Sequence, residues 1–165
     1  MKNFIARTIT GILFVAAVVV SFLDPVAMIA LFCLVTGLTV WEFTGLVNRR
    51  DDVSVNRFIS TVAGCYFFLA MAGYACGMTP PTVFVPYLVT ILYLLVSELY
   101  AKQPDPIHDW AYTMMSQLYV VLPFSLLNIL AFRVSAEGMT FTSVLPLSVF
   151  VFLWINDTGA YCCGS

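Results

Sequence analysis

Six long apolar runs fill almost the whole chain, and they constrain its fold more than any other feature. A helix that crosses a bilayer core of ~30 Å needs about 20 mostly apolar residues. A helix also satisfies its backbone hydrogen bonds within one segment, as lipid requires. We therefore expect an all-α fold, a polytopic transmembrane helical bundle of about six spans. The expected spans are Thr8–Leu23, Val26–Val47, Phe58–Cys76, Val83–Val96, Ala111–Phe132 and Phe141–Ile155.

The composition supports lipid as the solvent. Hydrophobic residues make up 61% of the chain and charged residues 10%, whereas soluble domains carry about 25% charged residues. A net charge of −2 without a basic run argues against nucleic acid as a partner. The five cysteines form no Cys-x-x-Cys pair, and the single His108 cannot complete a zinc site with them. We expect ordinary buried thiols.

The distribution of cations predicts the orientation. Lys2 and Arg7 precede the first apolar run, as in a signal peptide, but the run has no small-x-small cleavage site and further spans follow. We therefore expect an uncleaved first span. With a cytoplasmic N-terminus, six of the seven Lys and Arg residues lie on the inner side and only Arg133 lies outside. Six spans then return Asn156 and Asp157 to the cytoplasmic side.

Two carboxylates lie near the ends of expected spans. Glu42, in Trp41-Glu42-Phe43, is either an interfacial anchor or a partner for a cation or lipid headgroup. Glu98 ends the fourth span, and we expect it to be solvated.

The fifth expected span carries several polar side chains. Gln117, Ser125 and Asn128 have spacings that could place them on one helix face, and Ser116 precedes them. They predict either interhelical hydrogen bonds or the polar wall of a substrate cavity. Pro123 in this span and Pro146 in the sixth are expected to kink their helices.

Asp157 is the strongest candidate for a functional residue. An ionisable side chain at the edge of a bilayer core is costly to place there. Asn156 and Thr158 supply further oxygens, and Gly159 allows a close backbone approach. Carboxylates suit Mg²⁺, although a two-metal site would need more than Asp157. The alternative is that Asp157 ends or caps a helix.

The segment Asn156-Asp157-Thr158-Gly159-Ala160-Tyr161, followed by Gly164-Ser165, resembles the start of the conserved half of phosphatidate cytidylyltransferases. The start of the chain and the Trp41-Glu42-Phe43 patch resemble bacterial members less specifically. The resemblance divides the chain into transmembrane helices at 1–155 and the start of a catalytic half at 156–165.

The resemblance implies transfer of a cytidylyl group from CTP to phosphatidate, which yields CDP-diacylglycerol and pyrophosphate in phospholipid biosynthesis. It implies Asp157 as the catalytic residue, substrate binding by Asn156, Thr158 and Tyr161, Mg²⁺ as the cofactor, and a homodimer in a bacterial inner membrane. The family's lysine- and aspartate-rich motifs would lie beyond Ser165, so the metal ligands remain unknown and we expect this fragment to be inactive alone. A transporter and a lipid-binding structural membrane module remain the alternatives.

Overall fold

A computed structural model describes residues 2–100, 105–136 and 138–164 of the chain. These residues are mostly helical. In chain order the elements are α1 (Lys2–Ser21), α2 (Pro25–Val47), α3 (Arg57–Ala75), the 3-10 helix η1 (Pro81–Phe84), α4 (Val85–Tyr100), α5 (Pro106–Met115), the π-helical segment η2 (Ser116–Val121), α6 (Leu122–Ala131), β1 (Phe132–Ser135), β2 (Gly138–Phe141) and α7 (Val144–Cys163).

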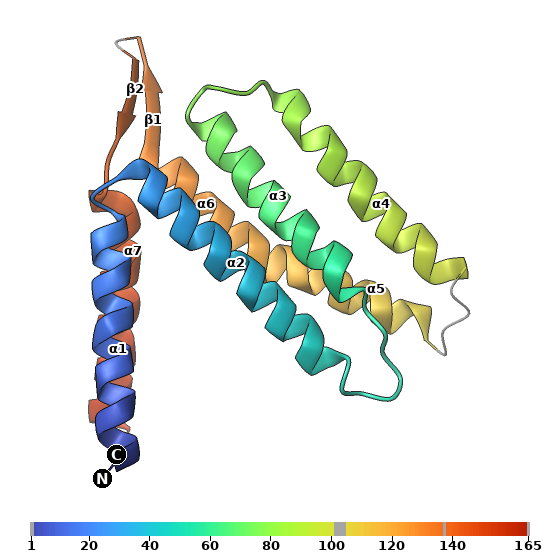
Figure 1. Cartoon of the computed structure of the whole chain (residues 1–165), viewed down its shortest axis with the longest axis horizontal. Coiled ribbons are helices and arrows are strands. Elements are labelled where there is room, and N and C mark those ends of the chain that lie inside the picture. The colour runs from blue at the N-terminus through green and yellow to red at the C-terminus, as the bar shows by residue number, and fades with distance from the viewer. Residues whose placement is uncertain (1, 101–104, 137, 165) are drawn as a thin grey trace.

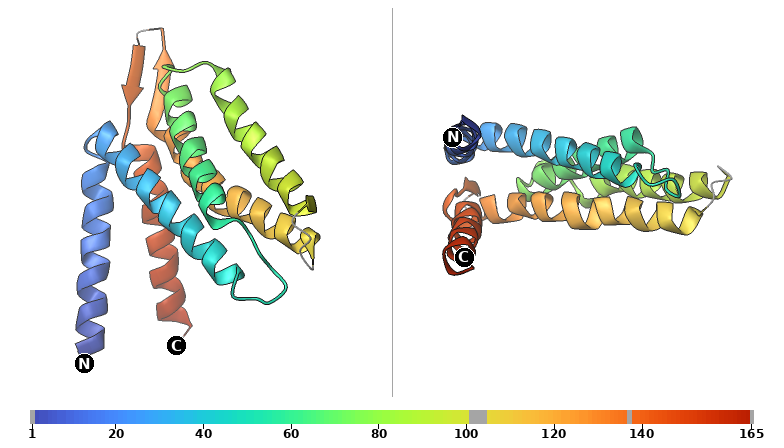
Figure 2. Two further views of the ribbon diagram at one scale, coloured as in Figure 1. Left: turned by 45° about the vertical axis from the view of Figure 1, so that its right-hand side comes forward. Right: turned by 90° about the horizontal axis from the view of Figure 1, so that it is seen from below.

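The helices form two groups (Figures 1 and 2). Helices α2, α3 and α4 lie beside the continuous rod made by α5, η2 and α6. Helices α1 and α7 stand at the end where α2 begins and α6 finishes, and they run at an angle to the other helices. The N-terminal end of α1, the α2–α3 connection and the C-terminal end of α7 lie on the side opposite the β-hairpin.

The expected all-α membrane bundle is confirmed. Within the described residues, four helices are long and apolar enough to cross a membrane, at Pro25–Val47, Arg57–Ala75, Pro81–Tyr100 and Pro106–Ala131. Two shorter apolar helices cover Ile9–Ser21 and Val144–Ala160. Together they match the six expected spans, with ends displaced by a few residues.

Local chemistry explains where the spans begin and end. The Asp24 carboxylate accepts a hydrogen bond of 2.8 Å from the Ala27 N–H, and Pro25 occupies the first turn of α2. The Asn56 side chain caps α3 in the same way, at 3.0 Å from the Ile59 nitrogen. Helix α3 stops before Gly77, whose φ of 70° suits glycine.

The hairpin of β1 and β2 is a feature that the sequence did not predict. The strands pair antiparallel, with Phe132 opposite Phe141 and Arg133 opposite Thr140. The Phe132 and Phe141 rings lie 5.3 Å apart between centroids. Such cross-strand aromatic pairs stabilise a short hairpin, which takes up the ends of the expected fifth and sixth spans.

Helix α7 begins and ends later than expected. It starts at Val144, so Pro146 lies in the first helical turn, where its missing N–H costs no intrahelical bond. The expected kink at Pro146 is therefore unnecessary. The helix then continues through Asn156–Tyr161 to Cys163.

An aromatic cluster joins the two groups of helices. Phe32 of α2 packs against Phe22, next to the end of α1, and against Phe150 of α7, at centroid distances of 5.5 and 5.4 Å. Phe22 and Phe32 are buried, as is Phe68 of α3 in the same cluster. Since lipid is as apolar as these side chains, close packing rather than exclusion of water stabilises the contact. The cluster fixes the direction of α7 and therefore the position of Asp157.

Candidate functional site

The last turns of α7 present the candidate residues on an exposed helix surface. Asn156, Asp157 and Thr158 are all exposed and helical. The Thr158 hydroxyl donates a hydrogen bond of 2.8 Å to the Trp154 carbonyl one turn earlier. Tyr161 belongs to the helix, but its side chain lies outside the described structure.

Asp157 lies within the apolar helix and not at its end. Helix α7 continues for six residues after Asp157, about 9 Å at ~1.5 Å per residue. The alternative in which Asp157 ends or caps a helix is therefore wrong. The apolar part of the helix, Val144–Ala160, contains Asp157. A carboxylate in such a segment is costly in lipid, so it is a candidate for a functional residue.

A shallow groove of about 450 Å³ lies along the same part of α7. Thr158 and Gly159 form its polar end, and an added Cβ at Gly159 would meet no atom within 4 Å. The rest of the lining is apolar and comes from Val151, Trp154 and Ile155. The structure thus brings Thr158 to a groove, whereas Asn156 and Asp157 lie on neighbouring exposed faces of the helix.

Among these residues of α7, Asp157 could supply one carboxylate ligand to a Mg²⁺ ion. Among the described residues, no group of three or more His, Cys, Asp or Glu side chains could hold a metal ion. In the last turns of α7, Asp157 offers an exposed carboxylate, and the neighbouring Asn156 amide offers a further oxygen. Mg²⁺ typically uses one or two protein carboxylates together with substrate phosphates, so Asp157 suits an ion that arrives with a nucleotide.

The polar residues of the fifth span form interhelical and local hydrogen bonds. Ser116, Gln117, Ser125 and Asn128 are all buried. Gln117 Nε2 donates to the Ser60 carbonyl of α3 at 3.0 Å, and Tyr87 of α4 donates to Gln117 Oε1 at 3.4 Å. The two serines donate to carbonyls of their own helix. Of the two readings of this span, the contacts favour interhelical packing over a cavity wall.

Pro123 follows a change in the form of the helix. Residues Ser116–Val121 are π-helical, and Pro123 lies in the first turn of α6. A π-helical turn relieves the loss of the proline N–H, because the ladder of hydrogen bonds is already shifted there.

The position of Glu98 differs from the sequence-based expectation. Glu98 was expected to be solvated but is only 6% exposed. Glu98 lies close enough to Asp109 for the two carboxyl groups to interact electrostatically. Asp109 is fully buried at the start of α5. Asp109 Oδ1 accepts a hydrogen bond from the Ser54 N–H. The connection between Glu98 and Asp109 is polar in sequence, but Asp109 in α5 is folded against the α2–α3 loop through its bond to Ser54.

The expectation of buried thiols holds for Cys76 among the described cysteines, whereas Cys33 and Cys65 are half-buried and Cys163 is exposed. Cys33, Cys65, Cys76 and Cys163 are free. Cys76 is buried, and Cys65 Sγ lies 3.9 Å from the Cys33 carbonyl oxygen.

Comparison with known proteins adds one finding. The model of the cytidylyltransferase family matches residues 5–165, essentially the whole chain. No curated protein and no solved structure matches the chain.

Proposed function

We propose a substrate and a site for this chain, which belongs to the cytidylyltransferase family. Membership of that family establishes CTP-dependent cytidylyl transfer as the general activity. The lipid acceptor that we propose is phosphatidate, and the products are CDP-diacylglycerol and pyrophosphate, in a step of phospholipid biosynthesis. The observation that carries this proposal is Asp157, an exposed carboxylate within an apolar helix of a membrane protein.

The reaction joins two anionic substrates. A phosphate oxygen of phosphatidate attacks the α-phosphorus of CTP, and the bond between that phosphorus and the oxygen bridging to the β-phosphate breaks. Pyrophosphate leaves with this oxygen. Phosphoryl-type transfers depend mainly on positioning and charge neutralisation, and a bound Mg²⁺ supplies that neutralisation.

The residues of α7 have distinct tasks in this proposal. Asp157 would hold Mg²⁺, which would neutralise charge on the phosphates of CTP, and Asn156, Thr158 and Tyr161 would bind the substrates. The apolar groove formed by Val151, Trp154 and Ile155 is suited to a lipid chain next to the reacting headgroup. A single carboxylate is too little for a two-metal transfer site, so a two-metal reaction would require further carboxylates besides Asp157.

The membrane placement is part of the same proposal. Several apolar helices indicate an integral membrane protein. We propose the inner membrane of a bacterium, a cytoplasmic N-terminus, and assembly as a homodimer. This orientation opens the Asp157 end of α7 to the compartment that contains CTP.

An activity assay of the native protein in its membrane tests the site. With labelled CTP and phosphatidate, we expect Asp157→Asn to lower the formation of CDP-diacylglycerol by about 100-fold or more, the usual cost of removing one preorganised electrostatic group. Asp51→Asn is the matched control, because Asp51 is an exposed carboxylate in the α2–α3 loop. Membrane insertion should be equal for both variants, and wild-type turnover by Asp157→Asn would refute the role of Asp157.

The alternatives give different results in the same preparation. A transporter would move a solute across proteoliposomes without CTP, and a structural or lipid-binding module would consume no CTP. Release of pyrophosphate that depends on added phosphatidate, and on no other lipid at equal concentration, is the result expected from the proposal. Equal release with diacylglycerol would contradict phosphatidate as the acceptor, since diacylglycerol lacks the attacking phosphate.

A further inference from the structure

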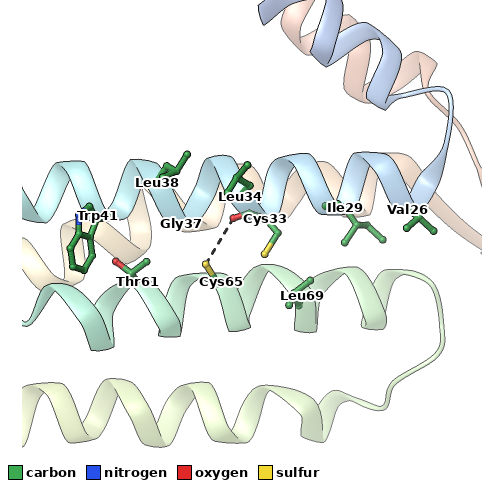
Figure 3. Close-up of a pocket in the computed structure, with 11 residues that line it drawn as sticks. Val26, Ile29, Cys33, Leu34, Gly37, Leu38, Trp41, Thr61, Cys65 and Leu69 are labelled. Carbon is green, nitrogen blue, oxygen red and sulfur yellow. Dashed lines mark hydrogen bonds between the residues drawn. The ribbon is translucent and has the colours of Figure 1, made fainter.

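A long apolar groove runs between α2 and α3 on the outside of the bundle (Figure 3). Its volume is about 810 Å³, and its lining is almost entirely apolar. Trp41 and Thr61 lie at one end, and Val26 and Leu69 lie toward the other. From Val26 to Trp41 the groove follows α2 for 15 steps of ~1.5 Å, about 22 Å, which exceeds one half of a ~30 Å bilayer core.

A second, more polar groove of about 550 Å³ adjoins the Trp41 end of the first. Leu38 and Trp41 line both grooves. The polar lining of the second groove consists of Glu42, Arg49 and Arg57. Together the two grooves therefore form one apolar groove with a charged end on the side of the α2–α3 loop.

Arg57 is held in this second groove by α2. Its guanidinium stacks on the Trp41 ring, 4.1 Å from the centroid, and Nη2 donates to the Trp41 carbonyl at 2.8 Å. Gly45 makes room for it, since a Cβ at that position would lie 2.6 Å from Nη2. Arg57 Nε is buried and has no hydrogen-bond partner within the described structure.

The loop before Arg57 is also fixed. The Asn48 side chain donates to the Val55 carbonyl and accepts from the Val55 N–H, both at 2.8 Å. Val47, Val53 and Val55 are buried together in the same loop region. Arg49 and Arg57 therefore come from a folded connection, and their positions are set before any ligand binds.

The charge balance of this groove is positive. Among the described residues, the ion pairs are Arg50 with Asp52 and His108 with Asp52 and Asp105, so none involves Arg49 or Arg57. Glu42 is the one carboxylate in the lining, against two guanidinium groups. Arginine forks bind phosphate oxygens in pairs of parallel hydrogen bonds.

We propose that the two grooves form a binding site for an anionic diacylglycerol phospholipid. Its phosphate lies between Arg49 and Arg57, and one acyl chain follows the apolar groove from Trp41 toward Val26. The positive charge at one end complements a lipid phosphate. The apolar groove at the other end is longer than one half of the bilayer core, so it can hold an acyl chain. The site is separate from Asp157, so it stands or fails independently of the proposed catalytic activity.

Lipid binding to the purified protein tests the headgroup end. Native mass spectrometry in detergent would compare dioleoyl-phosphatidylglycerol with dioleoyl-phosphatidylcholine. We expect the wild type to bind the anionic lipid preferentially. Arg49→Gln and Arg57→Gln should each weaken the binding of the anionic lipid by about fivefold. Arg50→Gln is the matched control and should keep the preference, because Arg50 pairs with Asp52 outside the groove. An equal loss in all three variants, or no preference in the wild type, would overturn the proposal.

Arg49→Gln separates binding from folding. Arg57 contributes a hydrogen bond to α2, so Arg57→Gln can weaken the fold, whereas Arg49 is exposed. The Arg49→Gln variant should melt at the wild-type temperature and still bind the anionic lipid about fivefold more weakly. Wild-type affinity in this variant would contradict the proposal.

The apolar end requires its own variant. Ala30 lines the groove and is exposed, so Ala30→Trp should fill the groove and weaken the binding of phosphatidylglycerol. Ala111→Trp, at an exposed position of α5 outside the groove, is the control. Soluble glycerol 3-phosphate should not displace the lipid, because it lacks the acyl chain. Displacement of the lipid by glycerol 3-phosphate would indicate a site for free phosphates. Dissociation of a dimer by Ala30→Trp would indicate that a second copy of the chain occupies the groove. Either result would overturn the proposal.

Discussion

At the scale of single residues, burial separates side chains with similar positions in the sequence. Glu98 and Asp157 both follow long apolar runs, yet Glu98 is buried against the α5 end and Asp157 is exposed. The sequence identified Asp157 as the costly carboxylate and predicted a solvated Glu98. Which of them faces the interior depends on how α4 meets α5, and that tertiary contact has no local signal.

Gln117 provides a prediction at this scale. Gln117→Leu removes the hydrogen bonds to Ser60 and Tyr87, so we expect a loss of about 0.6–1.7 kcal/mol in the free energy of unfolding, the range for interhelical bonds in membranes. Unfolding in mixed micelles measures this change. Thr90→Val is the control, because the half-buried Thr90 side chain donates to the Pro86 carbonyl of its own helix. A loss no larger than that of the control would show that Gln117 contributes no interhelical stabilisation.

At the scale of elements, the spans were predictable and the changes of backbone form were not. Asp24-Pro25 and Gly77 end or begin helices by local chemistry, which a sequence displays directly. The π-helical turn at Ser116–Val121 and the hairpin after Ala131 depend on packing. The hairpin strands are short, with aromatic residues at their outer ends, so they read equally well as the ends of helical spans.

The contact between α3 and η2 supports a second prediction. Gly64 of α3 lies so close to η2 that an added Cβ would stand 2.7 Å from Val121 Cγ2. We expect Gly64→Ala to destabilise the protein by about 1–3 kcal/mol through overpacking. Adding Val121→Ala should restore part of the loss, because it removes the clashing methyl groups. Gly11→Ala in α1 meets no atom within 4 Å and is the control; additive effects of Gly64→Ala and Val121→Ala would contradict the proposed contact.

At the scale of the whole molecule, the arrangement brings the N-terminal end of α1, the α2–α3 loop and the C-terminal end of α7 to one side of the bundle (Figure 2). Arg49 and Arg57 thus lie on the side opposite the hairpin that carries Arg133, as the expected spans require. The sequence also identified the Asn156–Tyr161 segment by its motif. It did not predict that the segment is helical or that Arg49 and Arg57 share a groove, because both depend on where α7 ends and how α2 packs on α3.

The side of the membrane on which residue 157 is reached tests the central claim most directly. In a background with all five cysteines replaced by alanine, Asp157→Cys would be treated with a membrane-impermeant thiol reagent in inside-out and right-side-out vesicles. We expect labelling in inside-out vesicles, because CTP must reach this position from the cytoplasm. Met139→Cys, on the exposed hairpin strand β2, should label only in right-side-out vesicles. Labelling of position 157 from the outer face would contradict both the orientation and the assignment of Asp157 to a CTP site.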